Sequence, residues 1–403
     1  MSFRFRLAKT KMLAAEAPFE LGGRQYAAGT FILPAANRAE VEKVIADLGL
    51  TAEAVGAVPS VANHALSVPR IGYLHSWLRT QDEGWWRAAL DHYGVPYTYF
   101  ADIKARQGGL RAKYDVIIYP TVGSSAKDQV TGVAMNGNKP IPYKKSALTP
   151  NLGTLDSADD IRGGLGADGI AELKKFVEQG GTLIGDGSTV EMLAEYGVAS
   201  GVSVAETPKL YTKGAIMRGV FKDKTSPLTY GYAGNEMPVY FSQAPVLKIG
   251  GSGPGMGYFD PNAPGSNIAQ NITPNDKPAH ISPWQGSGQQ ASPANTDVSN
   301  SPFGSMLPTS RTGGAAPTQF PRVVMAFPAK ADDILLSGML SGGEALQNNA
   351  LLVDVPKGQG HMVLYALRPF WRWQTQGSYF LGFNAIINWD HLDAGAKNGA
   401  KGD

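Results

Sequence analysis

The chain contains no cysteine, so disulfides, thiolate metal sites and cysteine nucleophiles are excluded. It also lacks an apolar run near the ~18 residues that a membrane-spanning helix needs. The charged first twenty residues have neither the apolar core nor the small-residue cleavage site of a signal peptide. Neither sign of charge dominates, because 36 basic and 34 acidic residues leave a net charge of +2. A chain with this charge balance has no excess of positive charge to attract nucleic acid or an anionic membrane surface.

What is present indicates a folded protein with a small unit at its start. Hydrophobic residues make up 43% of the 403 positions, which is enough to bury a sizeable core. We expect residues 1–66 to form a small α+β unit that ends in a linker. Its predicted elements are short strands at 3–7 and 23–34, a helix at 39–50 capped by Asn37, and a linker around 58–69.

Residues 67–395 predict a second, larger domain. Strands and helices alternate from residue 70 to residue 196, and the run 114–122 is almost continuously apolar, as in a parallel strand covered on both faces. This rhythm predicts an α/β fold with a doubly wound, mostly parallel, flavodoxin-like sheet and a binding crevice at the carboxyl ends of its strands. A Gly/Pro/Ser-rich stretch at 250–321 predicts a long irregular insertion, a turn at 357–360 predicts a hairpin, and 396–403 is a polar tail.

No complete catalytic motif is found. The six histidines do not form a zinc motif, so we expect no cofactor in this chain. A predicted strand–turn–helix at 182–197 holds Asp186, Gly187 and Ser188, but Gly-x-Ser-x-Gly is absent. We expect Ser188 to be a helix N-cap, and a nucleophile only if a histidine reached it. A dinucleotide fingerprint is incomplete here, because Val190 stands where a third glycine is needed.

Two polar-aromatic segments, 76–87 and 368–380, follow predicted strands. In a doubly wound sheet, such segments can converge on one crevice and bind a small molecule or a peptide. The candidate crevice residues, with those of the turn at 186–188, are Asp82, Glu83, Trp85, Arg87, Asp186, Ser188, Arg368, Trp371 and Gln374. The alternative is structural: Trp85 and Trp86 pack a helix, while Asp82, Arg368 and Arg372 form ion pairs at its rim.

These segments also carry a resemblance. Residues 70–100 (RIGYLHSWLRTQDEGWWRAALDHYGVPYTYF), 169–188 and 335–386, with YAAGTFILP at 26–34, resemble the class I glutamine amidotransferase-like domain at the C-terminus of bacterial zinc carboxypeptidase-like proteins. The resemblance implies a carboxypeptidase A-type domain outside this chain, which would carry the zinc, and an exported or periplasmic protein. The amidotransferase cysteine would lie near Asp186–Ser188, and Gln376 replaces a histidine that the family segment has.

Three functional hypotheses follow. The first is a non-catalytic binding or scaffolding module that acts with a peptidase domain or another protein partner. The second is an enzyme, either through a zinc carboxypeptidase domain outside the chain or through an unrecognised hydrolytic site that uses Ser188 or Asp186. The third is a carbohydrate-associated domain, since sugar rings stack on aromatic side chains such as the tryptophans of both segments.

Overall fold

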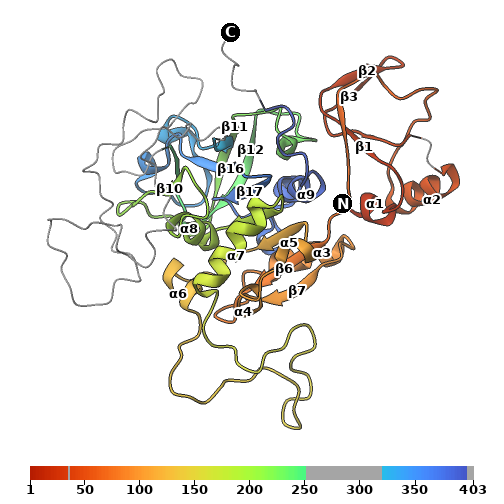
Figure 1. Cartoon of the computed structure of the whole chain (residues 1–403). Coiled ribbons are helices and arrows are strands. Elements are labelled where there is room, and N and C mark those ends of the chain that lie inside the picture. The colour runs from red at the N-terminus through yellow and green to blue at the C-terminus, as the bar shows by residue number, and fades with distance from the viewer. Residues whose placement is uncertain (35–36, 251–319, 397–403) are drawn as a thin grey trace, which may run out of the picture.

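The computed structural model describes residues 1–34, 37–250 and 320–396 (Figure 1). The insertion predicted at 250–321 and the tail predicted at 396–403 lie outside the described residues, apart from their end residues. Within the described ranges, no helix is long and apolar enough to cross a membrane.

The first part of the chain forms a small unit (Figure 1). Its buried apolar residues share one cluster with Tyr230 and Ile387: Leu7, Met12, Ala14, Val44 and Leu66. The helix predicted after Asn37 is confirmed, because the Asn37 side chain accepts a hydrogen bond from the Glu40 amide. The division of the chain at residue 66 stays a prediction. The elements of this part are α1 (Ser2–Arg6), β1 (Leu13–Ala15), β2 (Phe19–Leu21), β3 (Arg24–Tyr26), β4 (Phe31–Ile32), α2 (Arg38–Leu48) and β5 (Asn63–Ala65).

Two local predictions are wrong here. The sequence pattern predicts a strand at residues 3–7, but Ser2–Arg6 is a helix. The buried Arg4 guanidinium donates hydrogen bonds to the carbonyls of Leu7, Ala8 and Leu66, which all lie outside the helix. The pattern also predicts a linker at 58–69, but β5 within it pairs with β1 and completes the sheet β4-β1-β5.

The predicted α/β fold class is confirmed by the main sheet. Its parallel part has the strand order β7-β6-β8-β9-β17, and β6, β8 and β9 are buried along their whole length, as the apolar runs predict. The strands of this part are β6 (Ile71–His75), β7 (Thr98–Ala101), β8 (Val116–Tyr119), β9 (Thr182–Asp186) and β17 (Gly360–Tyr365).

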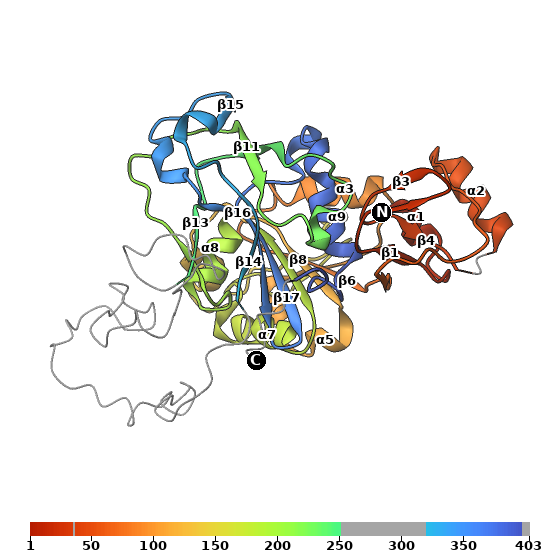
Figure 2. The ribbon, with the colours of Figure 1, turned by 90° about the horizontal axis from the view of Figure 1, so that it is seen from above.

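Helices cover both faces of the parallel part (Figure 2). On one face α4, α5 and α6 contact α7, which packs on β9 and β17. On the other face, Trp86 of α3 packs against Phe370, which in turn contacts Gly382 of α9. The helices are α3 (Gly84–His92), α4 (Asp102–Ala105), α5 (Leu110–Lys113), α6 (Ala126–Thr131), α7 (Gly166–Glu178), α8 (Ser188–Glu195) and α9 (Tyr379–Ile387).

Antiparallel strands extend the sheet beyond β17. The predicted hairpin is confirmed, since β16 and β17 pair antiparallel with Lys357 opposite Gly360. The sheet then continues in the order β16-β14-β11-β12, with β10, β13 and β15 attached to it. These strands are β10 (Val202–Val204), β11 (Ala215–Phe221), β12 (Glu236–Phe241), β13 (Leu247–Ile249), β14 (Arg322–Ala326), β15 (Leu335–Ser337) and β16 (Ala350–Lys357).

Gly360 lies where β17 packs against α7, and a substitution there tests this contact. A Cβ at this position would lie 2.3 Å from the carbonyl oxygens of Val177 and Gly181, which are backbone atoms that cannot swing away. We therefore expect Gly360→Ala to lower the unfolding free energy by about 3 kcal/mol. Gly56→Ala is the matched control, because a Cβ there meets nothing within 4 Å, and its effect should stay below about 0.5 kcal/mol. Chemical denaturation measures both, and equal losses would contradict this packing argument.

Candidate functional site

A polar pocket lies at the carboxyl ends of the parallel strands, next to the point where the strand order reverses. β7 lies on one side of β6 and β8 on the other, so the order reverses between β6 and β8, the usual position of a ligand site in this fold class. The pocket opens at the carboxyl ends of β8 and β9 and has a volume of about 400 Å³. Its lining residues are Arg79, Thr121, Gly123, Ser124, Ser125, Asp128, Ser188, Glu191, Ser242, Ala244 and Arg368.

The turn between β9 and α8 forms one wall of this pocket. Gly187, between the two elements, has φ 54° and ψ −131°, a conformation that residues with a side chain strongly disfavour. A Cβ at Gly187 would lie 2.6 Å from Thr121 Oγ1, so only glycine fits without movement. The prediction that Ser188 is the helix N-cap is wrong, since Gly187 takes that position and Ser188 begins the helix.

The Ser188 hydroxyl is held by the loop that follows β8. The Gly123 amide donates to Ser188 Oγ at 2.9 Å, and Thr121 Oγ1 lies 3.1 Å from the same oxygen. The Ser188 amide donates to Thr121 Oγ1 at 3.1 Å. Ser188 thus joins the ends of β8 and β9, and none of the described residues that line the pocket is a histidine.

Asp186 is buried beneath the pocket. The Thr121 amide donates to its Oδ1 at 2.6 Å, and the Trp86 indole N–H donates to its Oδ2 at 3.1 Å. Burial raises the pKa of Asp186 to about 6, against the Trp86 hydrogen bond and the positive charge of Arg368, which both favour the ionised carboxylate. Asp186 therefore ties helix α3 to the ends of β8 and β9.

The two polar-aromatic segments meet at the rim of the pocket. Arg368 forms an ion pair with Asp82 at 3.0 Å and lies 4.7 Å above the ring of Trp371. Trp371 stacks on Tyr240 at 4.8 Å and meets the edge of Trp85 at 6.3 Å. The sequence predicted either that the two segments meet at one crevice or that Asp82 and Arg368 form a structural ion pair. Both descriptions fit this contact, because the ion pair includes Arg368, a residue that lines the pocket.

Of the nine candidate residues, Ser188 and Arg368 line the pocket, and the other seven do not: Asp82, Glu83, Trp85, Arg87, Asp186, Trp371 and Gln374. Glu83 is buried and accepts a hydrogen bond from the Tyr99 hydroxyl at 2.7 Å, while Arg87 lies 4.4 Å above the Tyr99 ring. These residues are four apart on one helical face, which turns them toward β7. Gln374 is exposed. Whether the nine candidate residues bind a ligand stays a prediction.

Several lining residues were missed by the sequence analysis. The small residues Gly123, Ser124 and Ser125 follow directly after the apolar run 114–122, and that change of character was a usable signal for them. Ser242 and Ala244 gave no such signal, because they come from the antiparallel part of the sheet and reach the pocket only through tertiary structure.

Within residues 1–34, 37–250 and 320–396, no group of three or more His, Asp or Glu side chains is arranged to hold a metal ion. His75 at the end of β6 pairs with Asp156 at 2.9 Å, and His280 lies outside the described residues.

The similarity of the chain to known proteins lies at the level of solved structures. No family model and no curated protein matches it. Among solved structures, it is similar to a cytoplasmic protein of Salmonella typhimurium (TM-score 0.36, 11% identity, 79% of this chain and 97% of that one). It is also similar to a protein of Thermoplasma acidophilum described as a putative part of GMP synthase (0.38, 8%, 79% and 92%) and to a putative ThuA-like protein of Parabacteroides merdae (0.38, 7%, 82% and 92%). With TM-scores below 0.5, these likenesses carry no argument about function.

Asp186 makes the site sensitive to pH. Between pH 3.8 and about 6 the folded protein retains a proton on this carboxyl that the unfolded chain releases. The unfolding free energy should therefore fall as pH rises across this window, by about 3 kcal/mol from this group. The Trp86 indole proton resonance should titrate with a midpoint near pH 6 in the wild type and not in Asp186→Asn. Asp128→Asn, on the exposed pocket wall, is the control and should keep the titration of the Trp86 resonance. A titration of that resonance that persists in Asp186→Asn would contradict the assignment to Asp186.

Proposed function

We propose that this chain is a non-catalytic, amidotransferase-like accessory module, in which the pocket at the strand ends binds a ligand or partner group without reacting with it. The observation that carries the proposal is the glycine at the turn between β9 and α8. In a catalytic strand–turn–helix elbow, the residue on the strained turn is the nucleophile, and its side chain projects toward the substrate. Here that residue is Gly187, and Thr121 occupies the space that a side chain would need.

The neighbouring groups support binding over catalysis. Ser188 lies one residue beyond the strained position, and its oxygen already accepts a hydrogen bond from the Gly123 amide. Among the described lining residues, no histidine stands beside it to act as its base. The lining instead combines hydroxyl groups, two arginines and two carboxylates, which are groups that orient a polar ligand.

The proposed partner is a zinc carboxypeptidase-like domain. This portion of the proposal rests on the extended sequence resemblance over 70–100, 169–188 and 335–386. The alternative within the same family is that the chain belongs to an active zinc metallocarboxypeptidase whose catalytic domain lies outside these 403 residues. In either case, zinc and peptide hydrolysis belong to the other domain.

A combined metal and activity measurement on the purified chain tests the proposal. Elemental analysis after dialysis against micromolar zinc should find zinc well below one equivalent, and hippuryl-phenylalanine should release no phenylalanine above the buffer rate. One tightly bound zinc per chain together with release of the C-terminal residue would refute the accessory role.

A carbohydrate-associated role is the second candidate. It is favoured by five hydroxyl side chains among the lining residues and by the half-buried Trp371 beside Arg368. Saturation-transfer NMR with glucose and galactose should then show contacts that weaken in Ser242→Ala and persist in Ser337→Ala, an exposed serine on β15. Equal signals in both variants would remove this candidate.

A further inference from the structure

The segment between α6 and α7, residues 132–165, forms an arm that projects from the α/β domain at the bottom of Figure 1. Of residues 132–161, Asp156 alone is buried. The large apolar side chains of the arm are exposed, namely Met135, Ile141, Leu148 and Leu155. Hydrophobic burial therefore contributes little to holding the arm in place, and segments with few buried apolar contacts open at a low free-energy cost.

The two ends of the arm meet at a neck of glycine residues. Gly132 has φ 65° and ψ −156°, and Gly164 has φ 35°. A Cβ on Gly132 would overlap the Gly164 amide nitrogen, so the two backbones touch. The Arg106 guanidinium holds this neck, donating to the Gly164 carbonyl at 2.8 Å. Because glycine adopts a wider range of φ and ψ than other residues, the neck can absorb the change of backbone direction that a hinge requires.

Hydrogen bonds within the arm join its two sides. Tyr143 and Ala158 exchange both backbone hydrogen bonds, at 2.9 and 3.0 Å. Closer to the neck, the Arg162 guanidinium pairs with Asp160 at 2.7 Å and donates to the Gly137 carbonyl at 3.0 Å. The arm would therefore move as one unit.

Asp156 fastens the arm to the end of β6. Its Oδ2 lies 2.9 Å from His75 Nε2, and its Oδ1 forms an ion pair with Lys104. Beside this anchor, the Tyr143 ring packs on the Trp77 ring at 4.7 Å. His75 is the last residue of β6 and is only 2% exposed. The arm therefore covers the carboxyl end of β6.

The covered strand end lies where this fold class usually binds a ligand. The strand order reverses between β6 and β8, whereas the pocket lies at the ends of β8 and β9. Two buried nitrogens at the covered end, His75 Nδ1 and Trp77 Nε1, have no hydrogen-bond partner among the residues that the structure describes. Buried polar groups are usually paired, so an open arm would offer both nitrogens to a ligand.

We propose that residues 132–165 form a lid, hinged at the Gly132–Gly164 neck and latched by Asp156, that opens the carboxyl end of β6. The latch depends on a single carboxylate, and the arm buries little apolar surface. Opening should therefore leave the sheet beneath it folded.

Fluorine NMR of the full chain labelled with 5-fluorotryptophan tests the lid, and Trp77→Phe assigns the Trp77 resonance. The shift difference between H₂O and D₂O reports the solvent exposure of each indole. In the wild type, this difference should rise for Trp77 at urea concentrations that leave the buried Trp86 unchanged, because local opening precedes global unfolding. A single transition shared by both resonances would overturn the proposal, and this measurement needs no variant that has to fold.

Asp156→Ala should release the lid without urea. The isotope shift of Trp77 should then rise to about that of Trp373, which is 37% exposed, while the shift of Trp86 stays the same. Lys104→Met removes only one partner of Asp156 and should give a smaller rise. An unchanged Trp77 shift in Asp156→Ala, or an equal change at Trp86, would contradict a lid that opens on an intact core.

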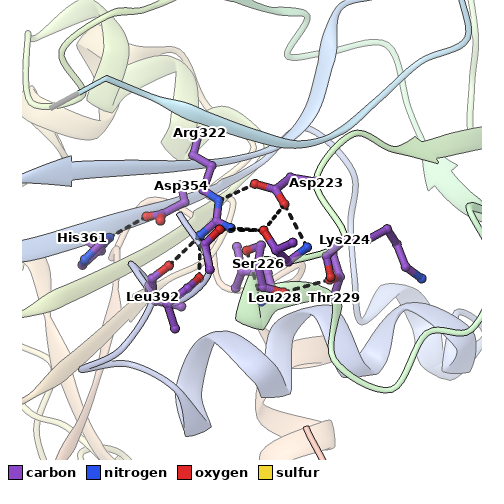
Figure 3. Close-up of polar contacts among 12 residues, drawn as sticks. Asp223, Lys224, Ser226, Leu228, Thr229, Arg322, Asp354, His361 and Leu392 are labelled. Carbon is purple, nitrogen blue, oxygen red and sulfur yellow. Dashed lines mark hydrogen bonds and ion pairs between the residues drawn. The ribbon is translucent and has the colours of Figure 1, made fainter. Parts of the chain in front are cut away.

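Two further variants separate lid opening from general destabilisation. Asp159→Ala removes an exposed carboxylate of the same arm, which pairs with Lys144 at 2.6 Å. Asp223→Ala removes a partly buried carboxylate that pairs at 2.7 Å with Arg322, the residue that holds the C-terminal segment through two carbonyls (Figure 3). Neither substitution should change the isotope shift of Trp77 in the absence of urea. A rise in either variant as large as in Asp156→Ala would show that Asp156 is not the latch.

Discussion

The close contact between Gly187 and Thr121 is the constraint on which the candidate site depends. The Gly187 conformation brings the start of α8 against the loop after β8, where Thr121, Gly123 and Ser188 share hydrogen bonds. The same contact fills the space in which a side chain on the turn would stand. One backbone feature therefore closes one wall of the pocket and leaves no room for a side chain at position 187.

Helix α9 links the site to the N-terminal unit. Gly382 of this helix packs on Phe370, and Phe370 contacts Trp86. The Trp86 indole N–H in turn donates a hydrogen bond to Asp186. Further along the same helix, the Asn384 side chain donates to the Leu228 and Tyr230 carbonyls, and the Tyr230 ring stacks on His64 of the N-terminal unit. One buried helix therefore contacts both the Phe370–Trp86 pair beside Asp186 and the segment around Tyr230.

The sequence was informative wherever a local pattern determines structure. The apolar run of β8, the Asn37 cap of α2 and the turn at 357–360 depend on neighbouring residues, and each prediction is confirmed. The predictions failed where contacts between residues distant in the sequence determine the structure. Residues 2–6 form a helix in which Arg4 bonds to the distant Leu66 carbonyl, and Ser242 reaches the pocket from another part of the sheet. The sequence pointed to the turn at 186–188, but the roles of Gly187 and Ser188 within it depend on Thr121, a residue far away along the chain.

We propose that the pocket does not react through Ser188, the residue next to the strained turn. The most direct measurement compares wild type with Ser188→Ala for hydrolysis of glutamine and p-nitrophenyl acetate, with circular dichroism to confirm that both are folded. Both proteins should match the buffer rate for each substrate. Saturable turnover by the wild type that disappears in Ser188→Ala would contradict it.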